Sequence, residues 1–346
     1  DMYVKCGFFE KAQEVIDKLP VRNVMTWNAL LAGYAQHGQG EKAFNCFVQM
    51  QREGHVPDGV TFTSILKACG VMGAVDEGIL IHAEVVSRSL INENIVLGTA
   101  LVDMYAKCGL LAKAQQVLED IHVRDIVSWS ALIAGYAQGG QGHEAINCFA
   151  RMQKEGIAPN EVTFASILKA CGCIGAIDKG EKIHDYIINN GLLDKSPMLN
   201  VSLVDMYVKC GAFARAREVI DKLVVRDTIS WSALISGYAQ KGHYSEALHC
   251  FKQMEEEGIS PNEITFVSVL TACCHSGKSD EAQMYYENII TKYGVTPTTE
   301  HHTCMVTVFG ISGLFDKAMS VIKTMPSSGD PSIWLALLAS CRKWGN

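Results

Sequence analysis

Apolar residues recur along this chain at the spacing of an α-helix, in short runs that end at glycine. One of the clearest runs places its apolar side chains at Val127, Trp129, Leu132, Ile133 and Tyr136. Gly139 and Gly140 break the pattern, and a second amphipathic run follows at residues 143–155. Because residues three and four apart share one face of a helix, the pattern predicts two short helices joined by a tight turn.

The same helix pair is repeated throughout the sequence. The 35 residues from Ile126 to Asn160 return with small changes at 24–58 and 228–262, so successive copies lie 102 residues apart. Each copy is followed by a 36-residue unit (59–94, 161–196 and 263–298) and then by a shorter unit (95–125, 197–227 and 299–330). Because each helix pair buries its apolar face against its neighbours, the periodicity predicts an all-α fold. We expect an α-solenoid, a right-handed superhelix of stacked helix-turn-helix repeats.

Helix starts and helix contacts can also be read from these units. Ser128 is a predicted N-cap, as are Thr26 and Thr61 at the matching positions of other units, because a hydroxyl accepts a hydrogen bond from first-turn backbone. Small residues are expected to let neighbouring helices approach closely at Ala131, Ala134 and Gly135.

Charge gives a weak argument against a nucleic-acid partner, because 30 Lys and Arg stand against 37 Asp and Glu, a net charge of −7. The acidic residues concentrate in the second helices and linkers, whereas first helices such as IVSWSALIAGYAQ carry no charge. The face formed by the first helices is therefore expected to be neutral, with scattered lysines: Lys5, Lys67, Lys107, Lys169 and Lys209. Lys107 has two interpretations, a phosphate contact or an ion pair with Asp103 four residues earlier, and Asp205 with Lys209 and Asp1 with Lys5 repeat them.

The 13 cysteines mostly follow the repeat, which predicts small core residues and not a disulfide framework. Three sets recur every 102 residues: Cys6, Cys108 and Cys210; Cys46, Cys148 and Cys250; Cys69, Cys171 and Cys273. The sequence has no CxxC spacing, so zinc and dithiol sites are not expected, and a reducing compartment is favoured. It also contains no signal or transit peptide and no run of about 18 apolar residues, so we expect no membrane association.

Catalytic motifs are sparse. His82-Ala83-Glu84 supplies half of the H-x-E signature of zinc deaminases, but the matched His184-Asp185-Tyr186 breaks it and no CxxC follows. His301 and His302 are adjacent and point in different directions on a helix. With no phosphate loop and no nucleophile elbow, the sequence predicts a binding protein that is not an enzyme and has no metal or cofactor.

The unequal unit lengths, together with DMYAKCG, SWSALIAGYAQ and EVTFASILKACG, resemble the plant pentatricopeptide repeat family, in particular its subclass with alternating P, L and S repeats. The resemblance covers essentially the whole chain. It assigns P repeats to 24–58, 126–160 and 228–262, L repeats to 59–94 and 161–196, and S repeats to 95–125 and 197–227. Residues 1–23 become a partial S repeat, 263–298 an L2-like repeat, 299–330 an S2-like repeat and 331–346 a truncated E-type motif.

This resemblance implies sequence-specific binding of single-stranded RNA in a chloroplast or mitochondrion, one nucleotide per repeat. It also implies that the protein specifies C-to-U editing sites or supports other transcript processing. The partners that it implies are RNA, an accessory editing factor and a deaminase, the last lying beyond Asn346 or supplied in trans. The alternative is a helical-repeat scaffold that binds a protein partner on the same kind of surface.

In the family, an apolar side chain at the second position of a repeat packs on the base. The corresponding residues are Met25, Val60, Val96, Val127, Val162, Met198, Ile229 and Ile264. Glu300 breaks the row in the 299–330 unit. Such a column suits base stacking without sequence preference. The alternative is that these are ordinary core residues near a helix start.

The fifth and last residues of a repeat read the base in this family. The pairs Asn28 with Asp58, Thr99 with Asp125, Ser130 with Asn160, Ser232 with Asn262 and Thr303 with Asp330 favour U, G, A, A and G in that order. Thr63 with Asn94 lies in an L repeat, where the code is weak, and three pairs are not coding: Ala165 with Ser196, Val201 with Asp227, and Val267 with Thr298. The predicted target reads 5′-UnGAnnAnG-3′. The alternative is that Ser, Thr and Asn occur at these positions only because they cap helices.

Overall fold

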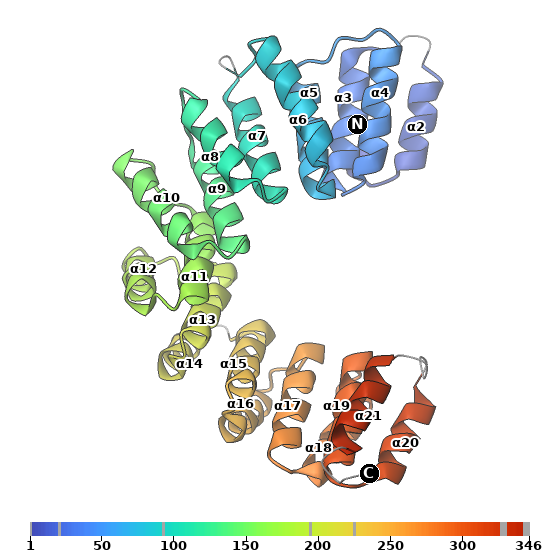
Figure 1. Cartoon of the computed structure of the whole chain (residues 1–346), viewed down its shortest axis with the longest axis vertical. Coiled ribbons are helices and arrows are strands. Elements are labelled where there is room, and N and C mark those ends of the chain that lie inside the picture. Colours follow the sequence, from blue (N-terminus) through green and yellow to red (C-terminus); the bar gives the residue numbers. More distant parts are fainter. Residues whose placement is uncertain are drawn as a thin grey trace. The chain divides into compact units, whose positions relative to one another are not determined.

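The structure is a computed structural model that describes residues 2–19, 22–91, 94–193, 196–223, 226–325 and 331–341. All regular secondary structure in these residues is α-helical, in 21 helices (Figure 1). The chain divides into two compact halves, residues 1–170 and 171–346. Each half is an α-solenoid of stacked helix pairs, as the periodicity predicts.

The first half contains ten complete helices and most of an eleventh. They are α1 (Met2–Lys5), α2 (Phe9–Asp17), α3 (Val24–Gln36), α4 (Gly40–Arg52), α5 (Gly59–Met72), α6 (Val75–Ser87), α7 (Ile95–Lys107), α8 (Leu111–Asp120), α9 (Ile126–Gln138), α10 (Gly142–Lys154) and α11 (Glu161–Ile174).

The second half begins with the end of α11. Its helices are α12 (Ile177–Asn189), α13 (Pro197–Lys209), α14 (Phe213–Lys222), α15 (Thr228–Gln240), α16 (Tyr244–Glu256), α17 (Glu263–His275), α18 (Ser279–Thr291), α19 (Thr299–Ile311), α20 (Phe315–Thr324) and α21 (Pro331–Cys341). None of the described helices has both the length and the apolar character needed to cross a bilayer.

Below, P, L and S are labels for the units of 35, 36 and 31 or 32 residues that the sequence delimits. A helix starts at the first residue of every such unit, and a second helix follows it. The first helices pack against one another in series. The series is α3, α5, α7 and α9 in the first half of the chain and α13, α15, α17, α19 and α21 in the second half (Figure 1). The second helices α2, α4, α6, α8, α10, α14, α16, α18 and α20 each pack against the first helix of the same repeat, so these repeats form two layers with the core between them.

Bulky and small residues alternate in this core. Trp27, Trp129 and Trp231 lie at one matched position of the three P units and have no exposed surface. Glycine lets the first helices approach closely. A Cβ added at Gly135 would lie 2.8 Å from the Cβ of Ala106, and one at Gly237 would lie 2.0 Å from Cγ1 of Val208. The expectation of a close approach at Gly135 is confirmed.

An arginine before each P unit braces the stack. The guanidinium of Arg124 donates to the carbonyl of Leu118 at 2.9 Å and to Oε1 of Glu155 at 2.7 Å. The indole N–H of Trp129 donates to the other oxygen of Glu155 at 3.1 Å. One carboxylate therefore joins the linker, the first helix and the end of the second helix of the same unit.

Histidine and tyrosine join each L unit to the S unit that follows it. Nδ1 of His82 lies 2.9 Å from the hydroxyl of Tyr105, and Nδ1 of His184 lies 2.8 Å from that of Tyr207. Burial lowers the pKa of both imidazoles. The neutral form of each histidine is therefore the one that the folded chain accommodates.

The cysteine prediction is confirmed for two of the three sets and is wrong for the third. Cys46, Cys148, Cys250, Cys69, Cys171 and Cys273 are buried. Cys6 is exposed, and Cys108 and Cys210 are half-buried. The last two lie just beyond the ends of α7 and α13, where the helix turns out of the core.

Gly237→Ala should lower the free energy of unfolding by about 1–3 kcal/mol, because the new methyl group overpacks the contact between α13 and α15. This loss runs against the better helix propensity of alanine. Urea unfolding followed by circular dichroism measures it. Val208→Ala removes the clashing atoms, so the double variant should be more stable than the sum of the two single effects; strict additivity would contradict the packing argument.

His184→Gln should weaken the dependence of thermal stability on pH. The pKa of His184 is lowered from its ordinary value of 6.5, so below that pH the unfolded chain binds more protons and the native state loses stability. The melting temperature should therefore fall less between pH 7.5 and 5.5 in the variant than in the wild type. His143→Gln is the matched control, because His143 lies exposed on α10. Equal pH slopes for His184→Gln and wild type would contradict this account.

Candidate nucleic-acid interface

A row of apolar side chains lies exposed at the starts of the first helices. Met25 is 78% exposed, Val127 55% and Met198 43%, and the other five second-position residues fall within this range. They are Val60, Val96, Val162, Ile229 and Ile264. The interpretation of these residues as ordinary core is therefore wrong. Glu300 is also exposed at the matching place on α19.

At seven unit boundaries in the described residues, the last residue before a unit caps the first helix of that unit. Oδ1 of Asp125 accepts from the backbone N–H of Ser128 at 2.8 Å, and Oδ1 of Asn160 accepts from that of Thr163 at 2.9 Å. Asn23, Asp58, Asn94, Asp227 and Asn262 cap their helices in the same way.

The predicted N-caps Ser128, Thr26 and Thr61 are therefore wrong by three residues. These hydroxyl residues lie in the first helical turn and return a hydrogen bond to the backbone N–H of the true cap. This reciprocal arrangement is a capping box, in which the preceding Asx residue has the extended backbone that a cap requires.

Fifth and last residues of several units meet across the helix boundary. Nδ2 of Asn28 donates to Oδ1 of Asp58 at 3.0 Å. The Thr99 hydroxyl donates to Oδ1 of Asp125 at 3.4 Å. The Ser232 hydroxyl donates to the carbonyl of Thr228 at 2.6 Å, and its oxygen lies 3.3 Å from Oδ1 of Asn262. These fifth residues are largely buried, with 8% of Asn28, 8% of Thr99 and 3% of Ser232 exposed.

Ser130 and Asn160 meet through a third residue. The Ser130 hydroxyl lies 2.6 Å from that of Thr163, which donates to Oδ1 of Asn160 at 2.8 Å. Thr163 was not singled out by the sequence analysis, and neither was Thr265 at the matching position. Their signal was available, because a threonine stands third in every L unit.

The structure does not join every predicted pair. The Thr63 hydroxyl donates to the carbonyl of Gly59 at 2.8 Å, and Asn94 accepts only from the backbone of α7. The Thr303 hydroxyl donates to the carbonyl of Thr299 at 2.8 Å. Asp330, its predicted partner, lies outside the described residues.

Capping occupies one side-chain atom of each last residue and leaves the other available. Oδ1 of Asn160 and of Asn262 accepts from the helix, and the structure records no partner for their Nδ2 among the residues it describes. In Asp58, Oδ1 receives the hydrogen bonds from Asn28 and Thr61, and none of these three goes to Oδ2. The available atom is thus a donor in the asparagine units and an acceptor in the aspartate unit.

Asp58 is held in its ionised form. Its partial burial by itself would raise the pKa, but the backbone N–H of Thr61 and the side chains of Asn28 and Thr61 all donate to the carboxylate and lower the pKa below its usual value. The carboxylate is therefore an acceptor throughout the neutral pH range.

Two of the lysines on the first helices are ion-paired. Nζ of Lys107 lies 2.6 Å from Asp103, and Nζ of Lys209 lies 2.6 Å from Asp205. The ion-pair interpretation is therefore confirmed for both. Lys67 and Lys169 are exposed, whereas the side chain of Lys5 and all of Asp1 lie outside the described residues.

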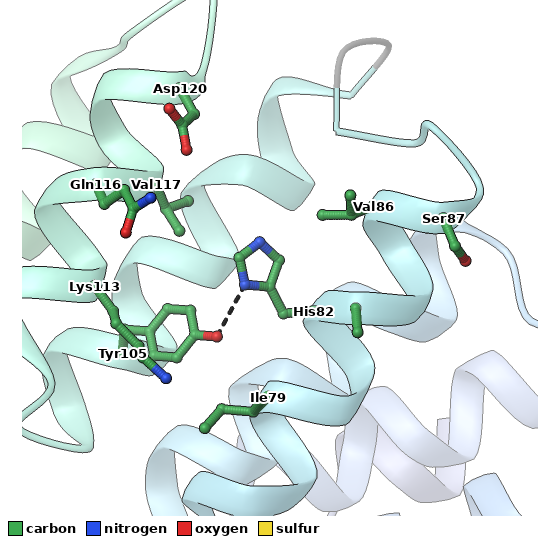
Figure 2. Close-up of a pocket in the computed structure, with 10 residues that line it drawn as sticks. Ile79, His82, Val86, Ser87, Tyr105, Lys113, Gln116, Val117 and Asp120 are labelled. Atoms are coloured by element: carbon green, nitrogen blue, oxygen red, sulfur yellow. Dashed lines mark hydrogen bonds between the residues drawn. The ribbon is translucent and has the colours of Figure 1, made fainter.

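A separate pocket of about 460 Å³ lies on the side of the second helices, between α6, α7 and α8 (Figure 2). His82 points into it toward Tyr105, with Lys113 and Asp120 on the facing helix (Figure 2). No group of three or more His, Cys, Asp or Glu side chains with metal-binding geometry occurs in the described part of the chain. His82 acts here as a packing and hydrogen-bonding residue, as His184 does in the next L unit.

Comparison with known families identifies the repeats. The PPR repeat family matches residues 22–70, 124–173 and 226–275, and the PPR repeat matches residues 1–24, 99–126, 264–292 and 300–330.

Relatives of similar sequence are known from Arabidopsis thaliana. A mitochondrial pentatricopeptide repeat-containing protein is 38% identical over 342 residues, which cover 99% of this chain and 61% of the relative. The chloroplastic pentatricopeptide repeat-containing protein CRR2 is 37% identical over 351 residues, which cover all of this chain and 53% of CRR2. The chain thus spans roughly half to three-fifths of the length of these relatives.

Solved structures share the fold. The maize pentatricopeptide repeat protein PPR10 matches with a TM-score of 0.66 and 20% identity, over 99% of this chain and 55% of PPR10. The same protein in complex with an 18-nt psaJ RNA element matches with the same TM-score over 56% of its length.

Proposed function

The chain belongs to the pentatricopeptide repeat family, and from that premise we propose that it is a sequence-specific single-stranded RNA-binding protein of a plant organelle. It reads one nucleotide per repeat. The observation that carries the proposal is the exposed apolar row at the second positions, which recurs beside polar side chains that meet across several of the unit boundaries.

The apolar row supplies the affinity that does not depend on sequence. Water-exposed Val, Ile and Met side chains recur once per unit at the same helix start. The faces of unstacked bases cover such side chains, which removes apolar surface from water on both partners. A base lodged between two successive second-position residues has its Watson–Crick edge toward the fifth and last residues.

The last residue supplies the discrimination. Nδ2 of Asn160 is a donor, which matches the acceptor N1 of adenine. Oδ2 of Asp58 is an acceptor, which matches the N3–H of uracil. Capping strengthens this choice, because it holds each side chain in one orientation before RNA arrives and so reduces the entropy lost on binding.

Capping and base reading are therefore compatible functions of one side chain. Asn160 and Asn262 cap with the oxygen and keep the amide N–H groups for the base. The capping alternative accounts for one atom of each side chain and leaves the choice between Asn and Asp unexplained, since the two cap about equally well.

The wider role that we propose for the protein is inferred from its relatives and not from the geometry of the site. The P, L and S subclass, the truncated E-type motif at 331–346 and the specification of C-to-U editing sites, as against other transcript processing, are all part of this proposal. The names of the relatives, mitochondrial and chloroplastic, support an organelle as the location. A deaminase would act from outside the 346 residues, and the array itself serves as the RNA-binding element.

Binding to a synthetic RNA that carries UnGAnnAnG should be at least about tenfold tighter than binding to the same RNA with both adenosines replaced by guanosine, because guanine presents an acceptor and a donor in the reverse order and so leaves polar groups unpaired. Fluorescence anisotropy at one fixed salt concentration measures both affinities. Equal binding to the two RNAs would contradict base reading. Binding to neither would favour the protein-scaffold alternative.

Asn160→Asp should shift the preference at the fourth base from adenosine toward guanosine by about tenfold. The substitution replaces the outward donor by an acceptor, which matches the N1–H of guanine, and it retains a good helix cap. The control is Asn147→Asp, which makes the same charge change on the exposed face of α10. An unchanged preference in Asn160→Asp would show that this residue only caps α11.

A further inference from the structure

A buried threonine stands third in each L unit, directly behind the proposed base-reading pair of the preceding P unit. Thr61, Thr163 and Thr265 have no exposed surface. Their hydroxyls lie 2.6 Å from the side chains of Asn28, Ser130 and Ser232, each 33 residues earlier. The same geometry at all three junctions shows that the contact belongs to the repeat.

The same hydroxyl also reaches the last residue of the P unit. The Thr61 hydroxyl shares its single proton between Oδ1 of Asn28 at 2.6 Å and Oδ1 of Asp58 at 2.9 Å, whereas those of Thr163 and Thr265 donate to Oδ1 of Asn160 and of Asn262 at 2.8 Å each. Each threonine therefore touches both members of one pair. The network lies beneath the pair, away from solvent.

We propose that Thr61, Thr163 and Thr265 are specificity-determining residues that position the base-reading pair and set which of its atoms donate and which accept. This inference rests on the proposed function. It assigns a role to residues that would not themselves contact the base.

The hydrogen bonds of the Thr163 hydroxyl show how this residue sets which atoms donate and which accept. Its oxygen accepts from the backbone N–H of Asn160 at 3.3 Å, and its single proton goes to Oδ1 of Asn160. The 2.6 Å contact with Ser130 then has Ser130 as the donor. With its proton committed to Thr163, the Ser130 oxygen offers only lone pairs to a ligand.

The resulting pattern suits adenine and opposes guanine. Ser130 accepts and Nδ2 of Asn160 donates, which complements the amino group and the N1 acceptor of adenine. Guanine presents an acceptor and a donor in the reverse order on the same edge. Without the threonine hydroxyl, the Ser130 proton is free to turn outward, and half of the pattern is lost.

The uridine unit uses the same device with another outcome. The Thr61 hydroxyl lies 2.6 Å from Oδ1 of Asn28, so the Asn28 carbonyl faces inward and its amide N–H groups face Asp58 and the ligand. A donor at Asn28 and an acceptor at Oδ2 of Asp58 complement the carbonyl and the N3–H of uracil.

Boundaries between S and P units supply a matched comparison. Ser128 is equally buried and also stands third in its unit. Its hydroxyl donates to the backbone carbonyl of Asp125 at 2.9 Å and accepts from the backbone N–H of Asp125 at 3.1 Å. No hydrogen bond joins Ser128 to Thr99 in this described region, so Ser128 shares the capping role of Thr163 without the link to the fifth residue.

The experiment compares Thr163→Val, Thr163→Ser and Ser128→Ala by anisotropy, on UnGAnnAnG and on the same RNA with guanosine as the fourth base. Wild type should prefer adenosine. Thr163→Val should lower the ratio of the two affinities about fivefold to tenfold, since it removes one hydrogen-bond constraint. Thr163→Ser should retain the ratio because it keeps the hydroxyl. Ser128→Ala should retain it because only the cap is altered.

The outcomes separate this inference from the function on which it rests. A wild-type chain that does not discriminate at the fourth base would overturn both. Discrimination that survives undiminished in Thr163→Val, or that Ser128→Ala lowers equally, would overturn the inference alone. Circular dichroism verifies folding. If Thr163→Val is unfolded, Thr61→Val decides the question at the first base, which faces Asn28 and Asp58: the ratio of the affinities for uridine and for cytidine there should fall.

Discussion

The hydrogen bond from a first-turn backbone N–H to the last side chain of the preceding unit is the contact on which the rest of this structure depends. It determines where each first helix starts, because Asp58, Asp125, Asn160 and Asn262 end the linker and begin the helix. The residue two places later is then turned toward solvent, and the residue five places along is turned toward the next boundary. The positions proposed for base stacking and for base reading both follow from this one local geometry.

A second constraint is the spacing of the helices. The tryptophans of the P units fill the layer between first and second helices, and glycines such as Gly237 admit a neighbouring side chain where a methyl group would collide. Within each compact half of the chain, these contacts set how closely successive first helices approach. Lys107 and Lys209 pair with aspartates one turn away, which reduces the positive charge of the first helices, so the proposed recognition relies on stacking and hydrogen bonds more than on net charge.

Much of this could be predicted from the sequence. Unit lengths and helix pairs follow from strict repetition, because a pattern that returns every 102 residues is not a local coincidence. The second-position row follows only from the family resemblance, and the sequence leaves open whether those residues lie in the core. The errors share a cause. Ser128 was assigned as a cap because hydroxyls favour helix starts, but Asp125 competes for the same N–H groups and has the extended backbone that a cap needs. Cys108 was assigned to the core by its period, although periodicity does not reveal how a helix end turns outward.

By itself the sequence determined the order and type of the units, since repetition and helical spacing are properties of the chain alone. Only the tertiary structure decided which polar atoms meet across a boundary. Thr163 and Ser130 are 33 residues apart and belong to different units, so no local pattern joins them. Stacking of the helices brings their hydroxyls to 2.6 Å in a site without water contact for Thr163, where a single proton has few places to go. The direction of that proton is a property of the folded array.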